Sequence, residues 1–289
     1  MKQRFPLAHK SFRDHLVAVL MMALVAAAVG AMDLLIYPSY RDSLKDFQMP
    51  AAFESFVGQG LSISSPEGFV NGEFYSWVPL LFITVAIIAG TGATAGEEAN
   101  GTMDILLAQP IRRRRLVLEK AGGIAVAAIL GVLLSLAGFY VVKPFIDFGV
   151  GPLRLFEATV STIPLVLLFG MLAVWAGVTF PTRSLASMFT IGVLVVAYFL
   201  QLMGPLASYL EWPQKLSPFY WSDSSLVVVH GMQWGRSALL LGVAAIFLAW
   251  AVFNFERRDI AAGAREWSAR SLFRRWRSGA PEGETEPSP

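Results

Sequence analysis

Two adjacent carboxylates, Glu97 and Glu98, follow a glycine-rich stretch, GTGATAG, at residues 90–96. Neighbouring residues of a helix point about 100° apart, so adjacent carboxylates form a poor acid–base pair. The glycine-rich stretch lacks the Gly-Lys-Ser/Thr sequence that brings a lysine and a hydroxyl to nucleotide phosphates. Because it ends a long apolar run, close packing of membrane helices is the better interpretation.

Other residue types that perform catalysis or bind metals are missing or scattered. The chain has no cysteine, which excludes disulfides and thiolate metal sites. The three histidines, His9, His15 and His230, show no spacing typical of a metal site or a Ser-His-Asp triad. We therefore expect no catalytic residue, no metal site and no cofactor bound by this chain.

Charge is concentrated in residues 96–120, GEEANGTMDILLAQPIRRRRLVLEK. Thr102 can cap a short helix that Pro110 ends. Its apolar positions, spaced i, i+3, i+4 and i+7, are Met103, Leu106, Leu107 and Pro110. The stripe could lie on a lipid surface while Arg112 to Arg115 contact anionic headgroups, or dock into a groove on a cytosolic subunit. The periodicity favours neither interpretation.

Composition places this charged segment in a membrane protein. Only 15% of the residues are charged and the mean hydropathy is +0.56, whereas about a quarter of the residues of a soluble domain are charged. Apolar runs long enough to cross a bilayer are Leu16–Ile36, Phe74–Ala95, Ala121–Val142, Ala158–Phe180, Leu185–Ala207 and Ser237–Phe255. The sequence predicts an all-α integral membrane protein with six transmembrane helices, the first a retained span rather than a signal peptide.

Buried charge is almost absent from these runs. Only Asp33 is an acid or base within them, and its position near the end of the first run predicts the outer interface. Proton- and ion-coupled pumps generally need ionisable groups inside the membrane. If the protein moves a substrate uphill, we expect a partner to supply the energy, and ATP hydrolysis at the cytoplasmic face fits.

The distribution of Lys and Arg predicts the orientation. Of the 23 basic residues, 17 fall at the two termini, in the 112–120 region or at Arg183, which six spans place on one side. The other side holds six. The positive-inside rule then predicts a multi-pass protein of the cytoplasmic membrane with both termini cytoplasmic.

The chain divides into three predicted regions. Residues 1–15 form a cytoplasmic interfacial helix, residues 16–255 the six-helix membrane domain, and residues 256–289 a tail that is first basic and then disordered. The outer loop 38–73 is long and acidic. The aromatic loop 208–234 is either an ordinary aromatic belt at the headgroups or a segment dipping into the outer leaflet.

Residues 97–120 strongly resemble the cytoplasmic segment after the second span in permeases of the ABC-2 type, the membrane subunits of one class of ATP-binding-cassette transporters. The matching positions are Glu98, Gly101, Thr102, Leu106, Leu107, Pro110, Ile111, Arg112 to Arg115 and Lys120. LSPFYW at 216–221 and FERRDI at 255–260 resemble weaker family patterns near the last span. The order of these motifs and the six-span layout extend the resemblance over nearly the whole chain.

The resemblance implies a transporter membrane subunit, not an enzyme, with an ABC-2 exporter-type permease fold. Two permeases, identical or homologous, would pair with two separate ATPase subunits that bind ATP and Mg²⁺. The translocation path would be lined by spans one, two and five, and the segment before the last span would be re-entrant. We expect contacts with membrane lipids and none with nucleic acid.

The resemblance also assigns roles within the coupling segment, 96–118. The residues expected to contact the ATPase are Glu97, Glu98, Gly101, Thr102, Met103, Leu106, Leu107 and Pro110. The basic residues expected at the membrane surface are Arg112, Arg113, Arg114, Arg115, Arg257 and Arg258. The alternatives are a membrane scaffold or assembly factor for an extracytoplasmic enzyme, working through the acidic outer loop, and an ATP-independent carrier or channel.

Overall fold

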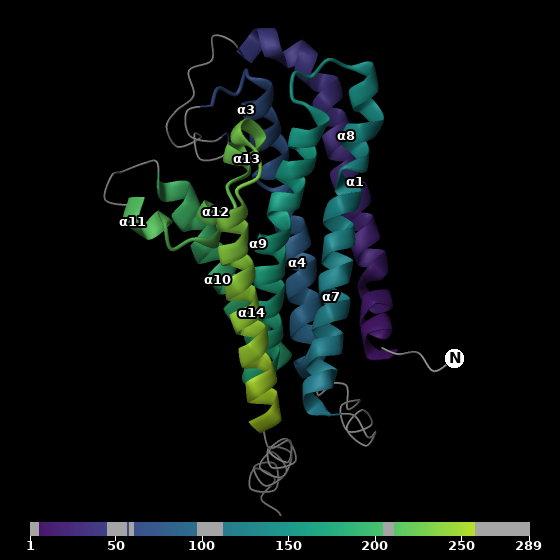
Figure 1. The fold of residues 1–289 in the computed structure, drawn as a ribbon, viewed down its shortest axis with the longest axis vertical. Coiled ribbons are helices and arrows are strands. Elements are labelled where there is room, and N and C mark those ends of the chain that lie inside the picture. The colour runs from purple at the N-terminus through teal and green to yellow at the C-terminus, as the bar shows by residue number, and fades with distance from the viewer. Residues whose placement is uncertain (1–5, 45–56, 58–60, 97–111, 205–210, 258–289) are drawn as a thin grey trace, which may run out of the picture. The chain divides into compact units, whose positions relative to one another are not determined.

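Long helices make up most of the structure, which is a computed structural model (Figure 1). It describes residues 6–44, 57, 61–96, 112–204 and 211–257, and within these ranges it contains helices and connections but no strand. Six stretches are long and apolar enough to cross a membrane: Lys10–Arg41, Pro66–Ala95, Arg113–Phe145, Pro152–Thr179, Arg183–Met203 and Trp234–Arg257. The predicted all-α fold with six membrane-spanning helices is therefore confirmed.

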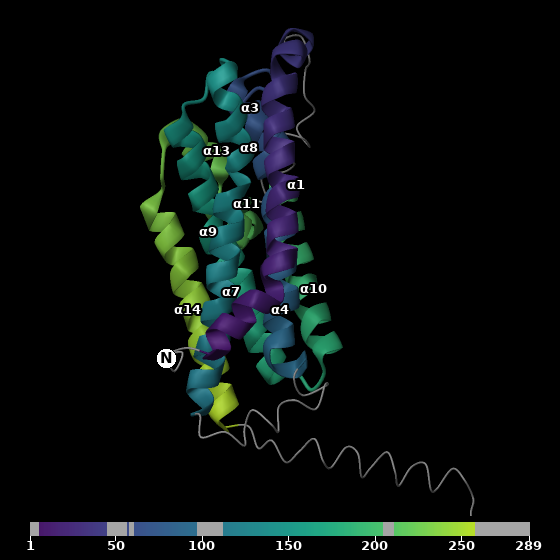
Figure 2. The same ribbon diagram turned by 90° about the vertical axis from the view of Figure 1, so that its right-hand side faces the viewer.

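The first span is helix α1 (Pro6–Leu44), which extends beyond the predicted run at both ends. It continues through Pro38, so helix replaces the first residues of the predicted outer loop 38–73. The predicted boundary at residue 15 also falls inside this helix. Figure 2 shows the N-terminal part of α1 turned away from the axis of the rest. Whether that part lies at a membrane surface stays a prediction.

The second span consists of four consecutive helical pieces. They are α3 (Pro66–Val70), η1 (Asn71–Tyr75), α4 (Val78–Thr91) and η2 (Gly92–Gly96), of which η1 and η2 are π-helices. The span starts before the predicted Phe74 because Ser65 caps α3, its Oγ accepting the amide of Gly68 at 3.1 Å. A π-helical turn holds one residue more than an α-helical turn, so α4 is flanked by wider turns at both ends.

The remaining spans also differ from the apolar runs at their ends. They are α7 (Arg113–Ser135) with α8 (Ala137–Val142) and η3 (Lys143–Phe145), then α9 (Pro152–Thr179), α10 (Arg183–Met203) and α14 (Trp234–Arg257). Helix α7 begins ahead of the predicted Ala121. The Arg112 carbonyl accepts the amide of Arg115 at 2.9 Å, and Leu116 and Val117 are buried.

Helix α9 is the most buried span and packs against α4, α7 and α10. Small residues allow this close packing: a Cβ added at Gly90 of α4 would lie 2.7 Å from the Cβ of Ala173 on α9. Lipid tails are as apolar as core side chains, so close van der Waals contact contributes much of the attraction between membrane helices. Aromatic rings also pack in the core, where Phe74 and Phe139 meet edge to face with centroids 4.6 Å apart.

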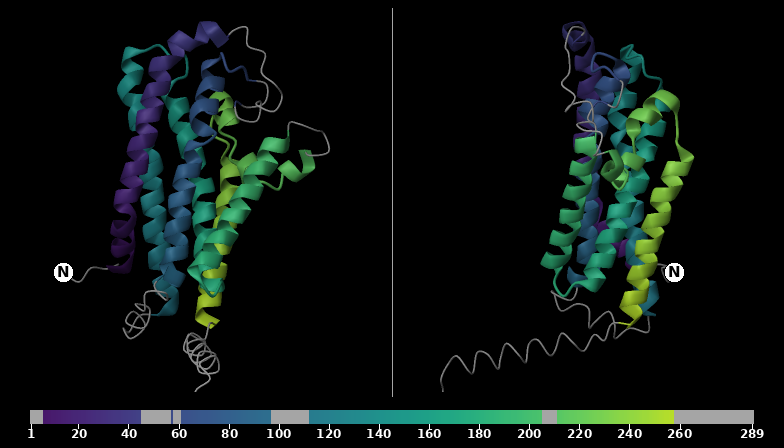
Figure 3. Two further views of the ribbon diagram at one scale, coloured as in Figure 1. Left: turned by 180° about the vertical axis from the view of Figure 1, so that it is seen from behind. Right: turned by 90° about the vertical axis from the view of Figure 1, so that its left-hand side faces the viewer.

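The spans are arranged so that α1, α4 and α10 share one side of the bundle. Figure 2 shows α14 on the opposite side, with α7 and α9 between, and Figure 3 shows α1, α4 and α10 together from behind. Helix α4 exposes Thr84 and Ile88, which are one helical turn apart. The α1–α4–α10 face is therefore a continuous surface of spans one, two and five.

Three short helices join α10 to α14: α11 (Glu211–Gln214), α12 (Pro218–Trp221) and α13 (Ser224–His230). Figure 1 shows α11 and α12 beside α10 and below the level of α13. Ser217 Oγ donates to the carbonyl of Ala197 on α10 at 2.6 Å, and Ser224 Oγ to Asn71 Oδ1 of η1 at 2.6 Å. The segment folds back onto the bundle, and whether it dips into the outer leaflet stays a prediction.

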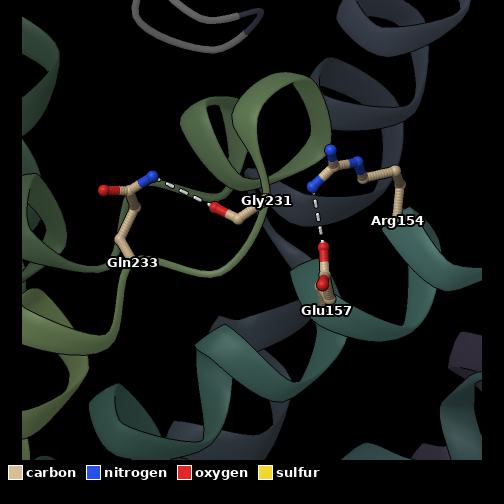
Figure 4. Close-up of polar contacts among 4 residues, drawn as sticks. All are labelled: Arg154, Glu157, Gly231 and Gln233. Carbon is tan, nitrogen blue, oxygen red and sulfur yellow. Dashed lines mark hydrogen bonds and ion pairs between the residues drawn. The ribbon is translucent and has the colours of Figure 1, made fainter.

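The chain turns from α13 into α14 at Gly231, shown in Figure 4. Its φ of 90° and ψ of −179° form a conformation that is essentially restricted to glycine. A Cβ at this position would also lie 1.9 Å from Nη1 of Arg154. Arg154 itself pairs with Glu157 on α9 at 2.9 Å, and Gln233 Nε2 donates to the Gly231 carbonyl at 3.1 Å.

Replacing Gly231 with alanine is expected to destabilise the protein by about 1–3 kcal/mol, because the backbone must leave its present conformation. Thermal unfolding of the purified protein in detergent measures the effect. Gly235→Ala is the matched control, since an added Cβ there meets no atom within 4 Å. Equal unfolding temperatures for the two variants would contradict the role assigned to the Gly231 turn.

Candidate coupling site

The predicted coupling segment is flanked by two described elements, η2, which ends at Gly96, and α7, which starts at Arg113. The segment's assigned residues Glu97, Glu98, Gly101, Thr102, Met103, Leu106, Leu107 and Pro110 lie outside the described residues, as does Arg258. The structure therefore bears on how the two ends of the segment are held.

Both ends are joined by Lys120, which is only 6% exposed. Its Nζ donates to the Ala93 carbonyl of η2 at 2.6 Å. The Lys120 carbonyl accepts a hydrogen bond from Ser11 Oγ of α1 at 3.3 Å. Ser11, Ala93 and Lys120 form what we call the Lys120 junction, which ties the beginning of span one, the end of span two and the beginning of span three.

A second buried charge lies beside the junction. Glu119 is 7% exposed, and its Oε1 lies 2.5 Å from Nε of Arg115, one turn earlier on α7. Burying a carboxylate costs several kcal/mol, and a close arginine with a charge-assisted hydrogen bond offsets much of that cost. The Arg115–Glu119 ion pair therefore both stabilises α7 and neutralises charge within it.

The π-helix η2 packs against α9 and α10 through small residues and hydroxyls. A Cβ at Gly177 of α9 would lie 3.0 Å from Thr94 Oγ1 of η2, so only glycine fits without a shift. Ser187 Oγ of α10 donates to Thr91 Oγ1 at the end of α4 at 3.1 Å. The end of span two is thus fixed by contacts with spans three, four and five.

The predicted surface arginines occupy different surroundings. Arg112 and Arg114 are exposed, Arg113 is half-buried, and Arg115, although exposed, pairs with Glu119. All but Arg112 lie within α7 rather than in a loop. Arg257 is exposed at the end of α14.

Asp33 is buried among the helices of the bundle, and its place near the outer interface stays a prediction. It is 5% exposed, and its Oδ2 is buried with no hydrogen-bond partner in the described parts of the chain. Helix α7 begins ahead of the predicted run Ala121–Val142 and adds two buried charged residues to the third span, Glu119 and Lys120.

Part of the junction was readable from the sequence and part was not. Lys120 belongs to the motif pattern, but its burial and its partner Ala93 depend on how η2 meets α7. The Arg115–Glu119 pair has the i, i+4 spacing of a helical ion pair, which would have revealed it had α7 been expected to start at Arg113. No local signal identifies Ser11 as a partner of Lys120.

These features define a multi-pass α-helical membrane protein whose first three spans are tied together at one end. A family model described as ABC-2 family transporter protein matches residues 5–260. The chain belongs to this family, so it is the membrane subunit of an ABC transporter, and membership implies association with an ABC ATPase subunit. Comparison with curated proteins finds no match to this chain.

Lys120→Met removes the donor while keeping much of the side-chain length. Amide hydrogen exchange in residues 92–96 and 113–118 is expected to accelerate by about tenfold to a hundredfold, the equivalent of one hydrogen bond from a charged group. Exchange followed by mass spectrometry measures this. Lys143→Met, at η3, is the control and is expected to leave both segments unchanged. Unaltered exchange in Lys120→Met would show that the junction does not hold these ends together.

Proposed function

We propose that this chain is the permease of an ABC exporter, in which residues 97–109 form the coupling helix that docks onto a separate ATPase. ATP and Mg²⁺ bind to the ATPase, two copies of which serve two permease chains. The coupling segment and both termini lie on the cytoplasmic side of the cytoplasmic membrane. The proposal rests on the family and on the motif of residues 97–120.

Among the structural observations, the Lys120 junction supports the proposal most directly. A docking segment transmits force only if its ends are joined to the elements that must move. Here the carbonyl of Ala93 precedes the segment, and it is bonded to the side chain of Lys120, which follows it. Through Ser11 the same junction reaches α1. A displacement of the segment would therefore act on spans one, two and three together.

The basic residues support a location of this end at the membrane surface. Arg112 and Arg114 are exposed at the start of α7, about two turns before Lys120, whose carbonyl binds Ser11 of α1. Arginines in this position can contact anionic headgroups, each contributing about 1 kcal/mol. These contacts would set the depth of the junction in the bilayer while the apolar stripe of the segment faces the ATPase.

The α1–α4–α10 face supports an arrangement with the substrate path between two permeases. Spans one, two and five lie side by side on it (Figure 3). Its central helix exposes the polar Thr84 next to Ile88, whose side chain is 51% exposed. A second permease facing this surface would enclose a path that these three spans line.

Replacing Leu106 and Leu107 together with aspartate is expected to abolish association with the ATPase, because two carboxylates cannot enter an apolar groove without large desolvation cost. Co-purification of the tagged permease with its ATPase measures association, and membrane fractionation checks insertion. The control is Ala108→Asp with Gln109→Asp, which adds the same charge away from the apolar stripe. Wild-type association and ATP turnover in the Leu106/Leu107 variant would refute the docking assignment and favour an ATP-independent carrier or a scaffold.

Because the chain contains no cysteine, a single introduced cysteine reports on one position. Thr84→Cys is expected to form a disulfide-linked permease dimer on mild oxidation in membranes. Ile246→Cys, on α14 and 62% exposed, is expected to stay monomeric. Gel electrophoresis without reductant distinguishes the two. Cross-linking through Ile246 but not Thr84 would place the second permease against the opposite side.

A further inference from the structure

A polar cavity of about 60 Å³ lies between η1, α4, α9, α10 and the short helices before α14. Its walls carry aromatic rings, amides, hydroxyls and one carboxylate, and no Lys or Arg lines it. The Lys120 junction involves none of these residues. We call it the α10–α12 cavity.

The walls of the cavity are fixed by internal hydrogen bonds. Asn71, 5% exposed, accepts from Ser224 Oγ at 2.6 Å and donates to the carbonyl of Val57 at 3.1 Å. The hydroxyl of Tyr75 donates to the Leu155 carbonyl of α9 at 2.9 Å. These bonds connect η1 to α9 and α13, so the cavity is a formed site rather than a gap between loosely packed helices.

Other polar groups of the lining residues have no protein partner. Asp223 caps α13: its Oδ1 accepts the amide of Ser225 at 3.0 Å and the Ser225 hydroxyl at 2.5 Å, whereas its Oδ2 bonds to none of the described residues. Gln201 accepts from Gln214 at 3.4 Å through its Oε1, while its Nε2 donates to no described group. The Tyr198 hydroxyl likewise has no hydrogen bond within the described ranges. One carboxylate oxygen, one amide and one phenol are therefore available to a ligand.

The charge around the cavity favours a cation. Asp223 is the only charged residue among those that line it. Arg236 is directed elsewhere: its Nη1 donates to the Tyr220 carbonyl at 3.2 Å and its guanidinium lies 5.3 Å from the centre of the Tyr220 ring. A carboxylate without a counter-ion in a semi-enclosed site attracts positive charge and repels phosphates and carboxylates.

Aromatic rings supply the second element of cation recognition. Tyr198 and Phe219 meet edge to face with centroids 5.4 Å apart, and both line the cavity with Tyr75. The faces of such rings attract an ammonium group, most strongly a methylated one that is weakly hydrated. Anionic ligands gain nothing from this arrangement.

We propose that the α10–α12 cavity binds the ammonium group of an amino alcohol such as choline. Asp223 Oδ2 supplies the counter-charge and the rings of Tyr198 and Phe219 contact the methyl groups. Gln201 Nε2 and the Tyr198 hydroxyl bind the neighbouring oxygen. The cavity is small, about 60 Å³, which suits a compact head such as a free amino alcohol or the end of a lipid headgroup. The inference goes beyond the proposed function, since it requires neither the ATPase nor transport.

The test is equilibrium binding of radiolabelled choline to the purified full chain in nanodiscs of phosphatidylglycerol. We expect saturable binding that the neutral tert-butyl analogue of choline does not displace. Asp223→Asn keeps the shape of the side chain and an oxygen for Ser225 but removes the charge, and is expected to weaken binding about tenfold or more. Tyr198→Leu removes the ring and is expected to weaken it several-fold. Asp147→Asn, which removes an exposed carboxylate elsewhere, is the matched control and is expected to bind as wild type.

The source of the ligand is decided by repeating the measurement in nanodiscs of phosphatidylcholine. Weaker choline binding there identifies the lipid headgroup as a competitor, and unchanged binding identifies the free amino alcohol. Absence of saturable binding to wild type in phosphatidylglycerol would overturn the proposal. Equal affinity for the neutral analogue, or wild-type affinity in an Asp223→Asn variant that unfolds at the wild-type temperature, would overturn it as well.

Discussion

The bond from the buried Lys120 ammonium to the Ala93 carbonyl is the interaction on which the coupling end of the bundle depends. An ammonium group almost out of reach of solvent is tolerated only where acceptors replace its water, and the last carbonyls of a helix are acceptors without partners of their own. The Lys120 ammonium of span three therefore donates a hydrogen bond to the Ala93 carbonyl at the end of span two. Loss of the Lys120 ammonium would remove the donor bound to the Ala93 carbonyl, so the two spans are expected to move as one unit at this end.

The general architecture was predictable because bilayer thickness sets the length of each span and lipid forbids unpaired backbone groups. Six apolar runs, with Asp33 as their single charged residue, predicted six spans, and the small residues Ala173 and Gly177 lie against α4. The ends of the spans were less predictable. The apolar runs end close to charged residues, but the helices extend further. Helix α1 continues through Pro38, and α7 already starts at the arginines.

Buried polar groups were the part that the sequence did not reveal. Asp33, Glu119 and Lys120 are all less than a tenth exposed, yet each stands at or beyond the end of an apolar run, where solvent contact is the natural expectation. Their burial results from neighbouring helices that extend past the same level. The α10–α12 cavity was unpredictable for the same reason, because Asn71, Tyr198 and Asp223 come from three distant stretches and only the tertiary fold assembles them.

The π-helical turn η2 has a consequence for the geometry of the chain beyond it. Each residue of an α-helix advances about 1.5 Å along the axis and about 100° around it. A turn with one additional residue therefore rotates the position of Gly96 about the helix axis, relative to its position in an uninterrupted α-helix. The direction in which the chain leaves span two is therefore set by the π-helical hydrogen bonds of residues 92–96, GATAG, which precede the charged motif.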